Sequence, residues 1–246
     1  MRNFHKLIII LSFLYMGSLT LFANDKGVKK LTEANFLEDG VCVEAAYNLG
    51  VYYFYGIGTE QNYKRSFKYF KLAADKGHID AQYNLGELYY LGLGIDKNYK
   101  KSAELTKILA NKNDVDGLIH LAMLYKKGIV YAKDINKTIK YLTLAAQQNS
   151  SLAEYNLGKL YEEGQDVKQN YYLAVKFYKL SADKNFAKAQ KKLAGLYLKG
   201  LGVKKDKNES NNLLKLSNLN EPKNTLKIIR GISSIAINKC LKTNND

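Results

Sequence analysis

Several residue types are scarce in this 246-residue chain, which holds one proline, two cysteines, three histidines and no tryptophan. So little proline argues against a turn-rich all-β sandwich. Two cysteines cannot build a disulfide scaffold or a cysteine-rich zinc site, and three histidines leave few ligands for another metal. We therefore expect neither a metal centre nor a cofactor.

The abundant residue types indicate a folded, helical and basic protein. Hydrophobic residues make up 46% of the chain and charged residues 25%, as in globular domains. Alanine, leucine, lysine, asparagine and tyrosine dominate, which favours helix. The 38 Lys and Arg residues outnumber the 23 Asp and Glu residues. Lysines on the outward face of a helix are normally a solvated surface, and the functional alternative is weak contact with an anionic envelope surface or an acidic partner.

The first 23 residues have the pattern of a secretory signal peptide. Arg2 and Lys6 precede an apolar run, and Ala23 stands at the expected cleavage point. The alternative is an uncleaved membrane anchor, although the run is shorter than the ~20 residues that span a bilayer. No later stretch is long enough to cross a membrane. We expect cleavage near Ala23 and a secreted or periplasmic mature chain.

A period of 36 residues repeats five times between residues 42 and 221. Leucine, tyrosine and glycine each recur in one slot of the repeat. The leucines are Leu49, Leu85, Leu121, Leu157 and Leu193, the tyrosines Tyr53, Tyr89, Tyr125, Tyr161 and Tyr197, and the glycines Gly56, Gly92, Gly128, Gly164 and Gly200. A fixed period of this length is typical of a helical repeat protein.

Each copy of the repeat predicts two amphipathic helices, which we call helix A and helix B. In the second copy Ala81 and Leu85 lie on one face of helix A, and Gly92 follows in the position of a left-handed cap. Leu105 and Leu109 share a face of helix B. One such hairpin cannot bury its own apolar face, so the copies must stack into an all-α solenoid. The expected order is a signal peptide, an N-terminal capping segment, five repeats, and a C-terminal capping helix with its tail, over residues 1–23, 24–41, 42–221 and 222–246.

At these positions the chain resembles the Sel-1-like repeat family, relatives of the tetratricopeptide repeat. Residues 81–94 and 73–77 are similar to that family's AxxxLGxLYxxGxG and AAxxG signatures. The third and fourth copies depart from the pattern at Gly117, Val130 and Asp166, which predicts altered turns. The resemblance, to a cysteine-poor branch of the family, implies a right-handed superhelical solenoid that acts as a protein-binding scaffold.

The resemblance also implies where a partner binds, because helix A lines the concave surface in this family. Helix-A slots that vary between copies are the candidates, and they run from aromatic in the early copies to basic in the later ones. The candidate residues are Tyr47, Asn48, Tyr55, Tyr83, Asn84, Tyr90, His120, Lys127 and Asn156. Two alternatives stay open: the tyrosines can pack between helices, and the recurring asparagines can be structural.

A weak hydrolase is the opposing functional class, because some secreted relatives carry a β-lactamase or penicillin-binding label. The chain has one Ser-x-x-Lys match, at Ser181 and Lys184, but lacks the accompanying Ser-Asp-Asn and Lys-Thr-Gly motifs. The match falls in the slot of Ala73-Ala74-Asp75-Lys76, so the repeat explains it without catalysis. We predict a scaffold without enzymatic activity that binds a protein or peptide and no nucleic acid.

The two cysteines lie at opposite ends of the predicted repeats. Stacked helix pairs place Cys42 and Cys240 roughly 50 Å apart, whereas a disulfide needs Cα atoms within about 7 Å. We therefore expect no internal disulfide. A buried Cys240 thiol and an intermolecular disulfide both stay open.

Overall fold

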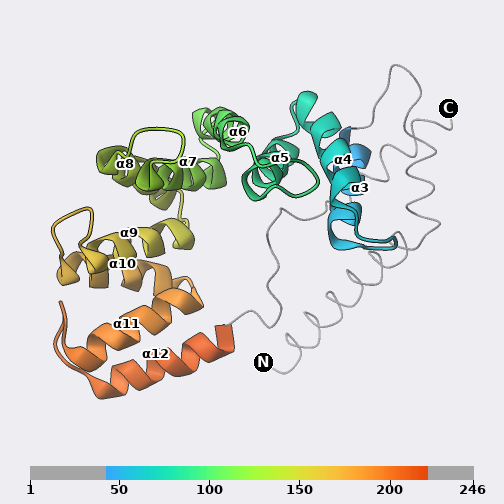
Figure 1. Ribbon diagram of the computed structural model, residues 1–246. Coiled ribbons are helices and arrows are strands. Elements are labelled where there is room, and N and C mark those ends of the chain that lie inside the picture. The colour runs from blue at the N-terminus through green and yellow to red at the C-terminus, as the bar shows by residue number, and fades with distance from the viewer. Residues whose placement is uncertain (1–42, 221–246) are drawn as a thin grey trace. The chain divides into compact units, whose positions relative to one another are not determined.

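The computed structural model describes residues 43–220, which form ten α-helices and no strand (Figure 1). The predicted signal peptide, both capping segments, Cys42 and Cys240 lie outside the described residues. Helix A of the five copies is α3 (Val43–Tyr55), α5 (Ile79–Leu91), α7 (Val115–Lys127), α9 (Ser151–Glu163) and α11 (Ala187–Lys199). Helix B is α4 (Tyr63–Asp75), α6 (Tyr99–Asn111), α8 (Ile135–Gln147), α10 (Tyr171–Asp183) and α12 (Lys207–Asn220). The helix starts recur every 36 residues, which confirms the predicted all-α repeat.

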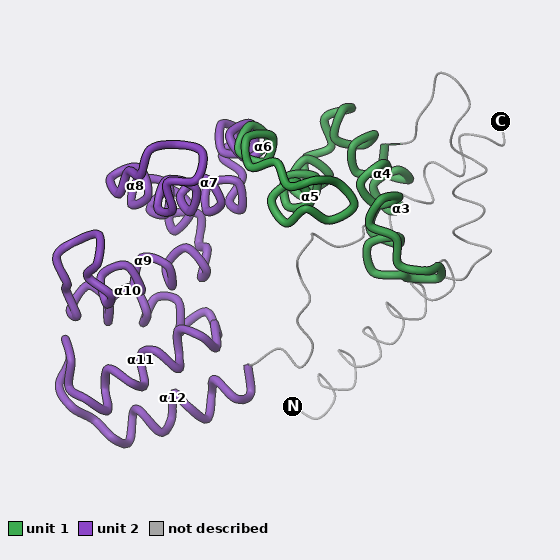
Figure 2. Tube along the Cα trace, viewed as in Figure 1, with its two compact units in different colours: residues 1–105, 227–246 green, residues 106–226 purple. Residues whose placement is uncertain are grey.

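The chain divides into two compact units, and the boundary falls inside α6 between Leu105 and Thr106 (Figure 2). In the first unit α3 packs on α4 and α4 on α5. In the second unit the helices from α7 to α12 pack along the chain in the same way, helix A on helix B and each copy on the next. Each unit has its own buried apolar cores. No helix of the described residues is long and apolar enough to span a membrane.

Every helix B begins after an asparagine or aspartate that caps it. The side-chain oxygen accepts a backbone N–H three residues later at 2.9 to 3.0 Å, which satisfies a donor that the first turn leaves without a partner. The five caps are Asn62, Asn98, Asp134, Asn170 and Asp206. This slot therefore fixes the start of helix B in each copy.

Helix A ends at the recurring glycine, as the sequence predicts. Gly92 has φ 74°, and its N–H donates to the carbonyl oxygen of Leu88 at 2.8 Å. Two residues later Gly94 also has a positive φ, and a Cβ there would lie 2.2 Å from the carbonyl oxygen of Tyr63. Val130 and Asp166 occupy this second slot without a positive φ, so the turns of the third and fourth copies do differ.

The recurring small and branched residues form the interface between the two helices of a copy. All five leucines of the leucine slot are at most 4% exposed. A Cβ at Gly50 would lie 2.5 Å from the ring of Phe70, and one at Gly158 would lie 2.7 Å from the ring of Tyr178. Helix A thus approaches helix B closely where it has no side chain, and a large ring fills the space beside it.

Candidate binding surface

The predicted binding surface is the helix-A face, which we define as positions 47, 48, 51, 54 and 55 of α3 and their equivalents in the other four copies. In α3 most of this face is packed: Tyr47, Asn48, Val51 and Phe54 are at most 2% exposed. Tyr47 stacks on the ring of His78, with ring centroids 4.4 Å apart. Tyr47 and Asn48 therefore lie in the interior, where the packing alternative places them, and present no open surface.

His78 has a structural use that explains its place in the turn. Its Nδ1 accepts the backbone N–H of Ala81 at 3.2 Å and so caps α5. Its Nε2 lies 3.3 Å from a carboxylate oxygen of Glu44. The imidazole thus joins the start of α3 to the start of α5.

The aromatic part of the helix-A face is half-buried rather than fully packed. Tyr55, Tyr83 and Tyr90 all keep part of their surface open, whereas Asn84 is buried. The ring of Tyr90 meets that of Tyr99 edge to face, with centroids 5.3 Å apart. Neighbouring rings therefore hold a tyrosine in place while one side of it remains available for contact.

The helix-A face of the second unit carries the remaining predicted residues. His120 and Asn156 are half-buried, and Lys127 is exposed. Met123 and Lys126, which lie beside them on α7, are also half-buried. This part of the face is more open than that of α3.

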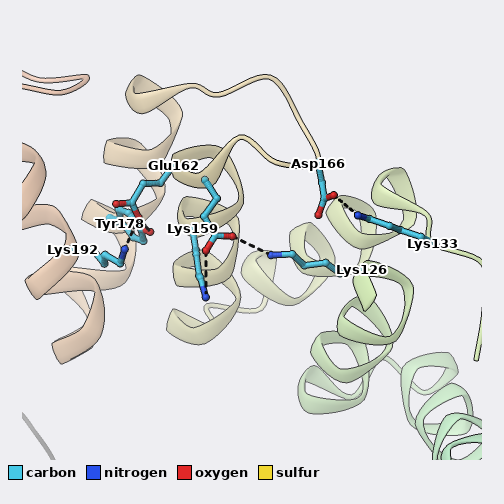
Figure 3. A network of polar contacts seen from close by, with 8 residues as sticks. Lys126, Lys133, Lys159, Glu162, Asp166, Tyr178 and Lys192 are labelled. Atoms are coloured by element: carbon cyan, nitrogen blue, oxygen red, sulfur yellow. Dashed lines mark hydrogen bonds and ion pairs between the residues drawn. The ribbon is translucent and has the colours of Figure 1, made fainter. Parts of the chain in front are cut away.

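Ion pairs between helices change the expected charge of this part of the face (Figure 3). Glu163 of α9 accepts from Lys126 of α7 at 3.4 Å and lies 3.5 Å from Lys159 of its own helix. Glu162 of α9 lies 2.9 Å from Lys192 of α11. The surface is therefore of mixed sign rather than basic throughout, because the two glutamates lie among three of the lysines and offset two of their three charges.

Glu162 also accepts a hydrogen bond from Tyr178 of α10, at 2.5 Å (Figure 3). Burial is the main cause that raises the pKa of Tyr178 above its usual range, and the hydrogen bond to Glu162 and its charge add to it. The phenol thus stays protonated and donates at every ordinary pH. Glu162 is held from two sides, by Tyr178 and by Lys192.

The Ser-x-x-Lys match does not form a reactive pair. Ser181 is fully buried, and its Oγ donates to the carbonyl oxygen of Ser151 at 2.7 Å. Lys184 instead contacts the buried Glu154 at 2.6 Å. Both side chains tie α10 to α9. Among the described residues, no group of three or more His, Cys, Asp or Glu side chains is placed to hold a metal ion.

Comparison with known proteins finds the same repeat throughout the described region. The Sel1 repeat matches five adjoining segments, at residues 43–78, 79–114, 115–150, 151–186 and 187–218. A Sel1 repeat protein from Oxalobacter formigenes, known from its crystal structure, is 28% identical to this chain in sequence. The match has a TM-score of 0.69 and covers 81% of this chain and 85% of that one. No curated protein matches the chain.

Two further solved structures are similar. The first is c5321, a protective antigen with an SLR fold from uropathogenic Escherichia coli, which is 26% identical with a TM-score of 0.62. That match covers 81% of this chain, which spans only 42% of c5321. A Sel1 repeat protein from Klebsiella pneumoniae is 21% identical, with a TM-score of 0.50 over 73% of this chain and 87% of that one, and is similar in fold alone. Because the repeat matches most of its length, this chain belongs to the Sel1 repeat family.

Proposed function

We propose that this protein is a binding scaffold that holds a protein or peptide along its helix-A face. One observation carries the proposal: the five leucines of the recurring leucine slot are all buried, whereas the residues of the helix-A face differ from copy to copy and most of them are half-buried or exposed from α5 onward. Packing explains why the leucine slot is the same in every copy, and it leaves the positions of the helix-A face free to vary. Sel1 repeats typically mediate contacts between proteins, which agrees with this division.

The chemistry of the face suggests which partner segment fits. Tyr83 and Tyr90 offer large, partly held rings, which suit apolar side chains and peptide groups. The second unit offers paired lysines and glutamates, so its polar contacts favour a segment that carries charges of both signs. The face of the first unit thus suits a segment with aromatic or apolar residues, and that of the second unit suits a segment with charges of both signs.

We also propose that the mature protein acts outside the cytoplasm. The support is the charged start, apolar run and Ala23 of the first 23 residues. The description of the relative c5321 as a protective antigen agrees with this location. N-terminal sequencing of protein recovered from the extracytoplasmic fraction tests the proposal. A start at or near Asn24 supports it, and an intact Met1 in that fraction contradicts cleavage.

Site-specific photo-crosslinking tests the proposed face. A photoreactive phenylalanine analogue replaces Tyr90 on the helix-A face in one variant and Tyr172 in a matched control. Tyr172 is 71% exposed and lies on α10, a helix B, so it reports on chance encounters. After irradiation with envelope extract we expect adducts from position 90 and none from position 172. Adducts from position 172 alone, or from neither position, contradict the proposal.

A further inference from the structure

A groove on the helix-B side of the first unit is separate from the helix-A face. It has a volume of about 660 Å³ and is lined by one side of α4 together with Gly94 and Ile95 of the turn that follows α5. None of the positions of the helix-A face takes part in it. We call it the α4 groove.

Four cations line the α4 groove. Lys64, Lys68 and Lys71 are spaced four and three residues apart and so form one stripe, about 10 Å long, on α4. Arg65 lies beside them, with its guanidinium over the ring of Tyr53 at 5.3 Å. All four side chains are on exposed residues, so their charges face solvent.

Carboxylates are few among the described residues that line the α4 groove. Asp75 is the one carboxylate among the described residues that line the α4 groove, and it pairs with Lys71 at 2.5 Å. That pair leaves Lys64, Arg65 and Lys68 as further cations along the groove. The groove thus offers a surplus of positive charge at several points along its length.

Between the cations the α4 groove is apolar. Phe67 and Leu72 line it and are half-buried, and Ile95 at the turn is 38% exposed. These side chains lie between charged neighbours on the same helix. A ligand that fills the groove therefore buries apolar surface while it meets the lysines.

No other helix B of the described region has this combination. The equivalents of positions 64, 65, 68 and 71 include Glu104 in α6, Asn136 in α8, Tyr172 in α10 and Glu209 in α12. α4 alone carries a cation in all four slots. Because packing repeats in every copy, it does not account for a charge pattern that occurs in one.

We propose that the α4 groove binds an acidic amphipathic peptide segment of a partner protein. Such a segment carries several carboxylates along its length, which matches the spread of the lysine stripe, and apolar side chains that reach Phe67 and Leu72. A fatty acid has a single carboxylate and leaves most of the stripe unpaired. A flat lipid surface meets the lysines but cannot reach half-buried apolar side chains between them.

Selection from a displayed library of random peptides on the purified mature protein tests this assignment. The peptides enriched on the wild type are measured by fluorescence anisotropy against Lys68→Glu/Lys71→Glu. The matched control is Lys176→Glu/Lys179→Glu on α10, which changes the same two slots and keeps an aspartate, Asp183, four residues after the second lysine. Circular dichroism confirms that both variants stay folded.

We expect enriched peptides rich in Glu or Asp and in Leu or Phe. Their affinity should fall about tenfold in Lys68→Glu/Lys71→Glu and stay unchanged in the control, since two rim contacts are lost and repulsion is added. Peptides that bind the variant as well as the wild type, or no enriched peptides, overturn the proposal. Binding to phosphatidylglycerol vesicles is measured with the same variants. If Lys68→Glu/Lys71→Glu weakens binding to these vesicles but not to the peptides, the proposal is also overturned. This test is independent of the function proposed for the helix-A face, because Tyr90 does not line the α4 groove. Peptide binding to the groove should therefore persist in Tyr90→Ala.

Discussion

The glycine that ends helix A is the residue whose replacement has the clearest expected cost. Gly92 has φ 74°, a conformation that alanine adopts with strain. We expect Gly92→Ala to lower the free energy of unfolding in urea by about 1 kcal/mol or more. The control is Gly195→Ala, inside α11, where a Cβ meets nothing within 4 Å and alanine should be neutral or stabilising. Equal effects at the two positions contradict the assigned turn.

The hydroxyl of Tyr178 is the second residue-scale test. It donates to Glu162 at 2.5 Å from a buried ring, so Tyr178→Phe removes a bond to a charged acceptor. We expect the free energy of unfolding to fall by about 1–2 kcal/mol. Tyr172→Phe, on the exposed side of α10, should change nothing. A neutral Tyr178→Phe means that Lys192 alone is sufficient to hold Glu162.

Single residues also mark how far the sequence predicts burial. Leu85 and its equivalents fall in the interior as expected, because a residue that recurs every 36 positions is needed in every copy. Tyr47 is buried although Tyr83 and Tyr155 in the same slot are half-buried, and Asn48 is buried although Asn156 is half-buried. A residue's slot fixes the side of the helix on which it lies, but not how closely that side is covered.

Among the helices, α9 joins its neighbours through charges. Glu163 lies 37 residues beyond Lys126, one more than the repeat period, so it pairs across two copies. A double-mutant cycle with Lys126→Met and Glu163→Gln should give a coupling of about 0.2–1 kcal/mol in thermal or urea unfolding, because the pair is partly exposed. The coupling should shrink as sodium chloride is added. A coupling that salt does not change argues against an ion pair.

The elements themselves follow from the sequence more completely than their contacts do. Apolar residues spaced three and four apart predict both helices of each copy, and the recurring glycine predicts the end of helix A. The Asn and Asp caps of helix B also recur every 36 residues, so aligning the five copies of the repeat also predicts where helix B begins. The pairs of Glu162 and Glu163 occur in one copy only, and a search for recurring residues cannot find them.

At the scale of the molecule, coupling between adjacent helices should spread the effect of a core substitution. Leu85 is 4% exposed, and Leu85→Ala should cost about 2–5 kcal/mol. Because repeats contact their neighbours, amide exchange should quicken across α4 and α5 and stay nearly unchanged in α11 and α12. Uniform quickening along the whole chain indicates instead a single cooperative unit.

The division into two units is a whole-molecule feature that the sequence does not reveal. The period of 36 residues passes through α6 without a break, although the boundary falls between Leu105 and Thr106. Recurring residues report the packing within a copy and between adjoining copies. They do not indicate the residue at which one compact unit ends and the next begins.

Binding along the helix-A face is tested most directly by measuring an affinity. The partner that crosslinks at position 90 is titrated calorimetrically against wild type, Tyr90→Ala and the control Tyr172→Ala. We expect Tyr90→Ala to weaken binding by about 1–2 kcal/mol while its melting temperature stays near that of the wild type. Unchanged affinity in Tyr90→Ala, or unfolding as severe as that of Leu85→Ala, would show that the ring belongs to the core and that the face is not the binding surface.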